Sequence, residues 1–285
     1  MGTAVTLSGS GFIGATSVKF NGTSATTFTV SSDTQVTATV PSGATSGTIS
    51  VTTPGGTATS ATSFSVTSPG LAVVQVQNNV DLVNTDTSLT VPITTTAGNL
   101  LVAFAREGPN AADNFTVTDS AGQTWFMTKS GYENESSTGP RIGMFYVANS
   151  KAVTSVTVNY TTSGGVTKPS LMVMEISGAA LSGVEDALVN NKSGASATTE
   201  TSGSLTTMNA NDILIFAGDA AGTETSWTAG AGYTIPNNKA TAGVSGSNAR
   251  TAMQYLIVSS TQTNARTSMT YSNANWNGNI FAAFK

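Results

Sequence analysis

The chain has 285 residues, of which only 11 are Lys or Arg and 15 are Asp or Glu, and it contains neither His nor Cys. Without imidazole or thiol groups it cannot form a Ser-His-Asp triad, a cysteine nucleophile or a His/Cys transition-metal site. The remaining chemistries are carboxylate catalysis of the glycosidase type, a lysine nucleophile or base, and oxygen-ligated Ca²⁺. No basic tract favours nucleic acid or an anionic membrane surface, and no apolar run is long enough for insertion across a bilayer.

The first 67 residues repeat short Thr, Ser and Val runs broken by Gly and Pro, and they carry only two ionised side chains, Lys19 and Asp33. Runs such as Thr48-Ile49-Ser50-Val51-Thr52 alternate apolar groups with hydroxyls, which is the period of a half-buried strand. Asn21-Gly22 supplies a tight turn between two such runs. The segment is therefore predicted to be a small β-sandwich with little capacity for chemistry.

Four motifs follow one another in this segment: Gly9-Ser10-Gly11-Phe12, Val18-Lys19-Phe20-Asn21-Gly22, Ala38-Thr39-Val40-Pro41 and Val51-Thr52-Thr53-Pro54-Gly55-Gly56. Together they resemble the IPT/TIG family of immunoglobulin-like domains, from Gly2 to about Thr67. The resemblance implies fold more than function, since family members act as spacers in bacterial surface proteins and polysaccharide-degrading enzymes and contact DNA in some eukaryotic transcription factors. A DNA-binding role is not expected, because Lys19 is the only basic residue of the segment.

A Pro-Gly break at Thr67-Ser68-Pro69-Gly70 ends the resemblance and predicts two domains. Residues 1–68 are assigned to the IPT/TIG Ig-like β-sandwich and residues 69–285 to one larger all-β domain. Once Lys19 and Asp33 are subtracted from the totals, the larger segment keeps 10 basic and 14 acidic residues. A polyanionic partner is therefore not expected there either.

Strand-like runs in residues 69–285 recur in one order, which indicates a weak internal duplication. The paired runs are 98–104 with 211–216, 141–146 with 250–255, 156–160 with 268–271, and 171–176 with 279–284. Runs that are apolar on both faces belong at sheet centres. We expect a jelly-roll-like β-sandwich of two interlocked halves, with two sequential small sandwiches as the rival layout. At most one helical turn is expected, around residues 184–188.

Three carboxylates are candidates for catalysis or cation binding. Glu175 interrupts an otherwise apolar run, where burial would raise its pKa towards that of a general acid, but a polar residue near a strand end is the simpler interpretation. Glu133 and Glu135 lie two apart in a polar loop that would suit Ca²⁺ or a sugar, and a solvated loop is again simpler. No catalytic residue is assigned and no cofactor is required, and Ca²⁺ is the one ion left open.

Aromatic residues beside amides give the stronger functional lead, because neutral sugars stack on flat rings while amides and carboxylates bond their hydroxyls. Trp276 lies between Asn275 and Asn277 in an Asn-rich run and is the best single site candidate. The secondary candidates are Trp227, Tyr132 beside Glu133, and Tyr233, whereas Trp125 is expected in the core. The competing interpretation is that Trp276 only seals one end of the sandwich.

Three functional classes fit these features. The first is a non-catalytic extracellular binding or adhesion module whose larger domain recognises neutral carbohydrate, with the Ig-like domain as a spacer. The second is a structural virion or cell-surface fibre component, which a homo-oligomer would favour, and the third is a glycan-cleaving enzyme that uses carboxylates. A location outside the cell or on its surface follows from the cysteine-free, Ser/Thr/Gly-rich composition and from the IPT/TIG resemblance, although residues 1–3 carry no signal-peptide leader.

Overall fold

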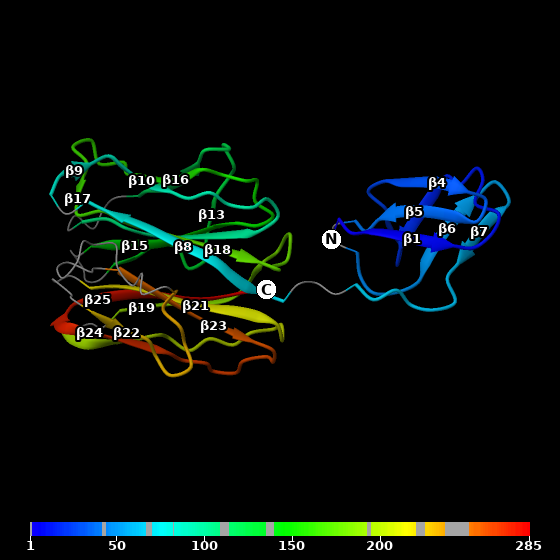
Figure 1. Cartoon of the computed structure of the whole chain (residues 1–285). Helices are drawn as coiled ribbons and strands as arrows, with labels where there is room; N and C mark the ends of the chain where they lie inside the picture. Colours follow the sequence, from blue (N-terminus) through cyan, green and yellow to red (C-terminus); the bar gives the residue numbers. More distant parts are fainter. Residues whose placement is uncertain are drawn as a thin grey trace. The chain divides into compact units, whose positions relative to one another are not determined.

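A computed structural model describes residues 2–41, 44–66, 70–81, 83–108, 114–134, 140–192, 195–220, 226–236 and 251–285. The chain divides into two compact units, Met1–Pro69 and Gly70–Lys285 (Figure 1). Every regular element among the described residues is a strand, and all strand pairs are antiparallel. The all-β class predicted from the sequence is confirmed. No helix that could span a membrane occurs in the described parts of the chain.

The first unit is a sandwich of two sheets, with strand orders β1-β5-β4 and β3-β2-β6-β7. Its core lies between them and includes Phe20, Val36 and Val51, while Lys19 between two buried neighbours is exposed. Asn21 and Gly22 both have positive φ in the turn after β2, as the turn dipeptide predicted. The strands are β1 (Ala4–Ser8), β2 (Ser17–Phe20), β3 (Thr23–Ser24), β4 (Phe28–Ser32), β5 (Gln35–Thr39), β6 (Ile49–Thr53) and β7 (Gly56–Thr59).

The first half of the larger unit contains two main sheets. The inner sheet has the order β13-β15-β11-β18-β8, with β14 also paired to β15, and the outer sheet has the order β10-β16-β12. The short strands β9 (Thr85–Asp86) and β17 (Val166–Thr167) pair separately. The others are β8 (Ala72–Val80), β10 (Ser88–Pro92), β11 (Leu100–Arg106), β12 (Thr116–Asp119), β13 (Phe126–Met127), β14 (Glu133–Asn134), β15 (Arg141–Val147), β16 (Ser155–Asn159) and β18 (Ser170–Ser177).

The second half repeats this plan. Its inner sheet has the order β19-β25-β21-β23, and its outer sheet has the order β20-β24-β22. The strands are β19 (Glu185–Lys192), β20 (Ala197–Thr201), β21 (Asp212–Ala220), β22 (Trp227–Thr228), β23 (Thr251–Val258), β24 (Ser268–Asn275) and β25 (Asn277–Phe284). With β8, β11, β15 and β18 matched to β19, β21, β23 and β25, the inner sheets share one strand order. The duplication read from the sequence is therefore present in the topology.

The two inner sheets face each other across one shared core. Leu100, Val102 and Phe104 of β11 lie in the same buried cluster as Ile213 and Ile215 of β21. Separate clusters fill the space between the inner and outer sheet of each half. The larger unit is thus a stack of four sheets, with the outer sheet of one half at the top and that of the other at the bottom in Figure 1.

This layout differs from the expected jelly roll of two interlocked halves. Each main sheet takes all its strands from one half of the segment, so the rival layout of two sequential sandwiches describes the strand pairing. The central strands β11 and β21 are apolar on both faces, and each is covered by an outer sheet on one side and by the other half on the second side. The helical turn expected around residues 184–188 is also wrong, because β19 starts at Glu185 and pairs with β25.

Candidate functional site

Trp276 lies at the corner where the chain leaves the outer sheet of the second half and enters the inner one. It is the single residue between β24 and β25, and its side chain is 42% exposed. Trp125 and Trp227, the other tryptophans of the chain, are half-buried and buried. Asn275 beside Trp276 is half-buried, and Asn273 is exposed. The indole of Trp276 is therefore exposed at this corner, with two amides beside it. Asn273 Nδ2 donates to Ser272 Oγ at 3.3 Å, and Asn275 Nδ2 donates to the Asn273 carbonyl at 3.3 Å.

Asn277, on the other side of Trp276, points inward and supports the corner. Its side chain is fully buried, and its Nδ2 donates to the Tyr271 hydroxyl at 2.6 Å. The Tyr271 ring packs on Trp227 with 4.7 Å between ring centroids. Asn277 and Trp227 thus lie inside the second sandwich, and they hold the backbone around Trp276 rather than offering surface to a ligand.

Tyr132 and Tyr233, both secondary candidates, are also held in the interior. Tyr132 is half-buried, packs edge-on against Phe115 with 4.9 Å between centroids, and donates its hydroxyl to the Phe115 carbonyl. Tyr233 packs against Phe281 at 6.4 Å, and burial raises the pKa of its phenol to about 12. Their contacts within the protein leave Trp276 as the candidate aromatic side chain with the largest exposed fraction.

Glu133, from the first half, lies near the Trp276 corner of the second half. Strand β14, which carries Glu133, packs against β19 and β25. The Glu133 carboxylate is 3.4 Å from Nζ of Lys192 in β19, and Lys192 is the register partner of Gly278 in β25. The structure therefore brings together two candidates that are more than 140 residues apart in sequence. Glu135 lies outside the described residues.

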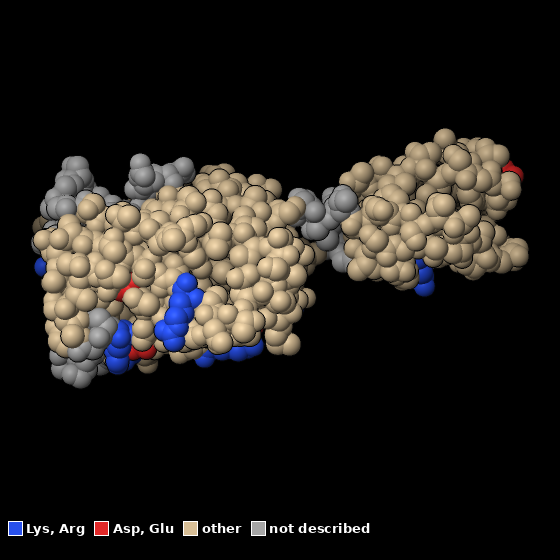
Figure 2. All heavy atoms as spheres, turned by 90° about the horizontal axis from the view of Figure 1, so that it is seen from below, with Lys and Arg blue, Asp and Glu red and all other residues tan. Residues whose placement is uncertain are grey.

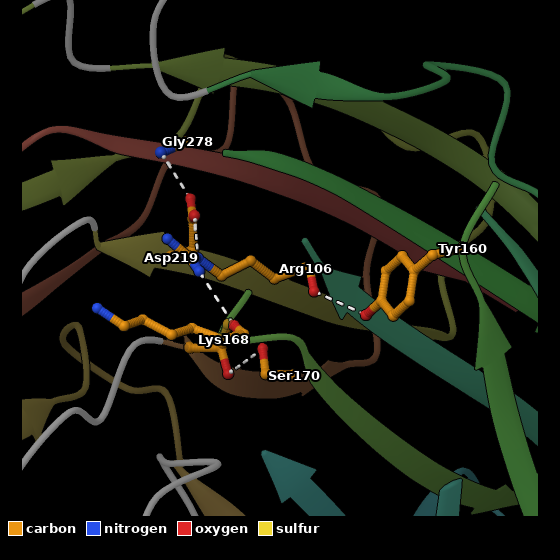
Figure 3. Close-up of polar contacts among 7 residues, drawn as sticks. Arg106, Tyr160, Lys168, Ser170, Asp219 and Gly278 are labelled. Carbon is orange, nitrogen blue, oxygen red and sulfur yellow. Dashed lines mark hydrogen bonds and ion pairs between the residues drawn. The ribbon is translucent and has the colours of Figure 1, made fainter. Parts of the chain in front are cut away.

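A buried ion pair anchors this end of the larger unit. Nε of Arg106 donates to Asp219 Oδ2 at 2.8 Å, and neither side chain exceeds 2% exposure. Asp219 Oδ1 accepts the backbone N–H of Gly278 at 3.0 Å, and the Arg106 carbonyl accepts the Tyr160 hydroxyl at 2.9 Å. Figure 3 shows Asp219 between the guanidinium of Arg106 and the nitrogen of Gly278. Gly278, two residues beyond Trp276, is thus fixed by a charged acceptor.

Sequence reasoning missed this pair, although a signal was present. Leu100 in β11 and Ile213 in β21 are each the first residue of their strand that faces the core shared by the two halves. Counted from these residues, Arg106 and Asp219 are at equivalent positions of the duplicated run. Opposite charges at equivalent positions, each at or next to the end of an apolar strand, can meet only if the two halves face each other. That the two halves face each other is a feature of the tertiary structure, and the strand pattern within one half gives no information about it.

Glu175 is enclosed by donors and has a structural role. It is fully buried in β18, where Oε1 accepts the Thr96 N–H and Nδ2 of Asn99, and Oε2 accepts Nε2 of Gln75, each at 2.7 Å. These bonds tie β18 to β8 and to the segment before β11. A carboxylate held this way has no free face for a substrate, which favours the simpler interpretation made from the sequence.

A carboxylate pair lies where β19 and β21 begin. Burial alone would raise the pKa of Asp186, but the backbone N–H groups of Asn209 and Met208 outweigh burial and lower that pKa. Burial, followed by the neighbouring Asp186, raises the pKa of Asp212 to about 6. Among the described residues no group of three acidic side chains gathers around a common point, so Ca²⁺ binding stays a prediction.

The first unit has a groove of 560 Å³ beside the edge strands β1 and β7. Its walls are apolar core side chains and hydroxyls, and it contains no ionisable group. Nothing converges there in the way that polar groups converge in a specific ligand site. The lining residues are Val5, Thr6, Leu7, Ser8, Gly9, Ser10, Phe12, Ile49, Val51, Ala58, Thr59, Ser60, Thr62, Ser63 and Phe64.

Comparison with known proteins identifies the first unit. Residues 1–66 match the family model of the IPT/TIG domain, which confirms the resemblance seen in the sequence motifs. A search of curated proteins found no match.

Several solved structures share a weak likeness with the chain. A crystal structure of two domains, C and D, is 17% identical and covers 61% of this chain and 93% of its own, with a TM-score of 0.22. SGBP-B of a Bacteroides ovatus mixed-linkage glucan utilization locus, solved with a heptasaccharide, is 17% identical over 55% of this chain and 49% of its own, with a TM-score of 0.20. SGBP-B of a Bacteroides uniformis xyloglucan utilization locus is 13% identical over 100% and 94%, with a TM-score of 0.21. At these TM-scores the likeness carries no argument about this chain.

Proposed function

We propose that the protein is a non-catalytic carbohydrate-binding module that works outside the cell or on its surface. The larger unit is the binding head and the IPT/TIG domain is the spacer. The observation that carries the proposal is Trp276, a 42% exposed indole at a sheet corner with the amides of Asn273 and Asn275 beside it. A flat apolar ring next to amide donors and acceptors matches the alternating apolar faces and hydroxyls of a sugar.

The backbone that presents Trp276 is held on its C-terminal side, which suits a binding platform. Asn277 is bonded to Tyr271 inside the sandwich, and the Gly278 nitrogen is bonded to Asp219. A platform that is already ordered loses little conformational entropy when a ligand binds. A tryptophan that merely sealed the sandwich would bury most of its ring, as Trp227 does at 9% exposure.

The charge distribution favours a neutral ligand. Acidic and basic side chains form a few separate spots on the face seen in Figure 2, and most of that surface is uncharged. Lys192, whose strand β19 pairs with β25 beside the Trp276 corner, is paired with Glu133. A polyanionic or polycationic ligand would meet no complementary field here.

The non-catalytic part of the proposal rests on Glu175. Its two oxygens accept three hydrogen bonds inside the protein, so this carboxylate is not available as a general acid or base. Glu133 is paired with Lys192 instead of with a second carboxylate, whereas glycoside hydrolysis uses two carboxylates that flank the scissile bond.

The proposal is tested by titrating the intact chain with neutral polysaccharides and oligosaccharides, using calorimetry and tryptophan fluorescence. Binding is expected to be saturable and to fall by about 10-fold or more in Trp276→Ala, because one stacked aromatic contributes on the order of 1–3 kcal/mol. Trp276→Phe should retain part of the affinity. Phe126→Ala is the matched control, since Phe126 is 57% exposed in β13, away from the corner.

Two results would contradict the proposal. One is the absence of binding to every neutral glycan in a broad panel, which would favour a structural or fibre component. The other is binding that Trp276→Ala and Phe126→Ala leave equally unchanged, which would place the site elsewhere on the molecule.

A further inference from the structure

We propose that the binding surface spans both halves of the larger unit, with Lys192 as a second ligand contact beside Trp276. The ligand is then an extended neutral oligosaccharide segment that reaches across the corner, rather than one terminal sugar. This inference rests on the function proposed for Trp276, and it assigns a role to a residue that the sequence patterns do not single out.

The register of the inner sheet places the two residues close together. Lys192 pairs with Gly278, and Trp276 lies two residues before Gly278. With a rise of about 3.3 Å per residue and about 4.8 Å between neighbouring strands, their backbones are about 8 Å apart. A long lysine side chain bridges most of such a gap, so both groups fall within the reach of a single oligosaccharide.

Lys192 is exposed enough to bind and is held in place from the first half. Its side chain is 50% exposed, while that of its partner Glu133 is 20% exposed. An ammonium group has three donors, and the carboxylate at 3.4 Å does not occupy all of them. The remaining donors can bond sugar hydroxyls, and the partly buried Glu133 restricts where the ammonium lies.

A second ion pair on the same seam provides an internal comparison. Nζ of Lys129 is 3.6 Å from Glu185 Oε1, and it too connects the β13–β14 segment to β19. The Lys129 side chain is 82% exposed, yet its partner lies at Glu185, the end of β19 opposite to Lys192. Lys129 therefore shares the structural role of an inter-half ion pair but is remote from Trp276.

The experiment compares Lys192→Met with Lys129→Met, both of which keep an apolar stem of similar length. Each variant and the unchanged chain are titrated with a graded length series of the oligosaccharide whose polymer binds best. We expect affinity to rise with length and then level off in the unchanged chain. In Lys192→Met the longer members should bind about 10-fold more weakly, as expected for a lost hydrogen bond to a charged group, while the shortest binding member is unaffected.

Controls separate this inference from the function on which it rests. Lys129→Met should bind every length normally. Thermal unfolding is measured for both variants, and Lys129→Met is expected to be the less stable one, because it leaves the 4% exposed Glu185 carboxylate without this partner, whereas the Glu133 side chain is 20% exposed. Equal binding of long members by Lys192→Met and the unchanged chain, with Trp276→Ala still defective, overturns the two-half surface alone. Full binding by Trp276→Ala places the site elsewhere on the molecule and overturns the Trp276 site on which this inference rests.

Discussion

The two halves of the larger unit have one strand order but carry different polar groups at equivalent positions. Glu175 pairs with Leu101 in the first half, and its counterpart Ala283 pairs with Leu214 in the second. The buried carboxylate therefore has no equivalent in the second half. The apolar positions that both halves share specify the sheets, whereas the buried polar groups differ from one half to the other.

The connection between outer and inner sheet differs in the same way. In the first half, ten residues separate β16 from β18, and they include the short strand β17. In the second half, Trp276 alone separates β24 from β25. A long connection can fold over its sandwich, but a single residue at a sharp corner exposes its side chain. The candidate site thus belongs to the half with the shorter connection.

Breaking the contact between the halves should have the largest effect. Arg106→Met leaves Asp219 charged and buried without its partner, and removal of one member of a buried ion pair costs about 3–5 kcal/mol. The free energy of unfolding from urea titration should fall by that amount. The double variant Arg106→Met/Asp219→Leu should recover much of it, because neither position then carries a buried charge. A double variant as unstable as the single one would contradict this account of the pair.

Replacing Glu175 by alanine, the residue at the equivalent position of the second half, should lower the free energy of unfolding by less than the Arg106 substitution does. Glu175→Ala removes the acceptor of three hydrogen bonds and leaves the half-buried amide of Asn99 without this acceptor, at about 1–3 kcal/mol in total, while the Gln75 amide keeps its bond to the Thr94 carbonyl. Glu175→Gln should cost less because one amide oxygen still accepts. Denaturant unfolding measures both variants, and carbohydrate binding at Trp276 should be unchanged. Loss of binding in Glu175→Gln with intact stability would revive a direct role for this carboxylate.

The sequence predicts the parts of this fold that depend on local pattern. Alternation and turn residues were sufficient for the β class and the IPT/TIG unit, and the repeated apolar runs were sufficient for the duplication. They could not reveal that the halves pack through their inner sheets, because a strand apolar on both faces fits either a jelly roll or a four-sheet stack. The same limit explains the site: Trp276 was visible as a motif, but its proximity to Lys192 depends on register between β19 and β25.

The substitution Asp212→Asn should have the smallest effect on stability, and that effect should depend on pH. It gives the second half the residue that the first half has at the start of its central strand. Asp212 is equivalent to Asn99, and its pKa is raised to about 6 by burial and by Asp186. The folded state therefore holds the proton more tightly than the unfolded state, so stability falls as pH rises from about 4 to about 6 and stays lower above that range.

Asp212→Asn should remove this dependence, since an amide does not titrate. The variant should gain about 1 kcal/mol over the unchanged chain at pH 7 to 8 and little or nothing at pH 4, when Tm and urea unfolding are followed across that range. The N–H groups of Asn209 and Met208, which lower the pKa of Asp186, are kept in the variant. If the stability curves of the variant and the unchanged chain instead differ by the same amount at every pH, the folded state does not hold a proton between Asp186 and Asp212. The difference between Asp212 and Asn99 would then affect packing alone.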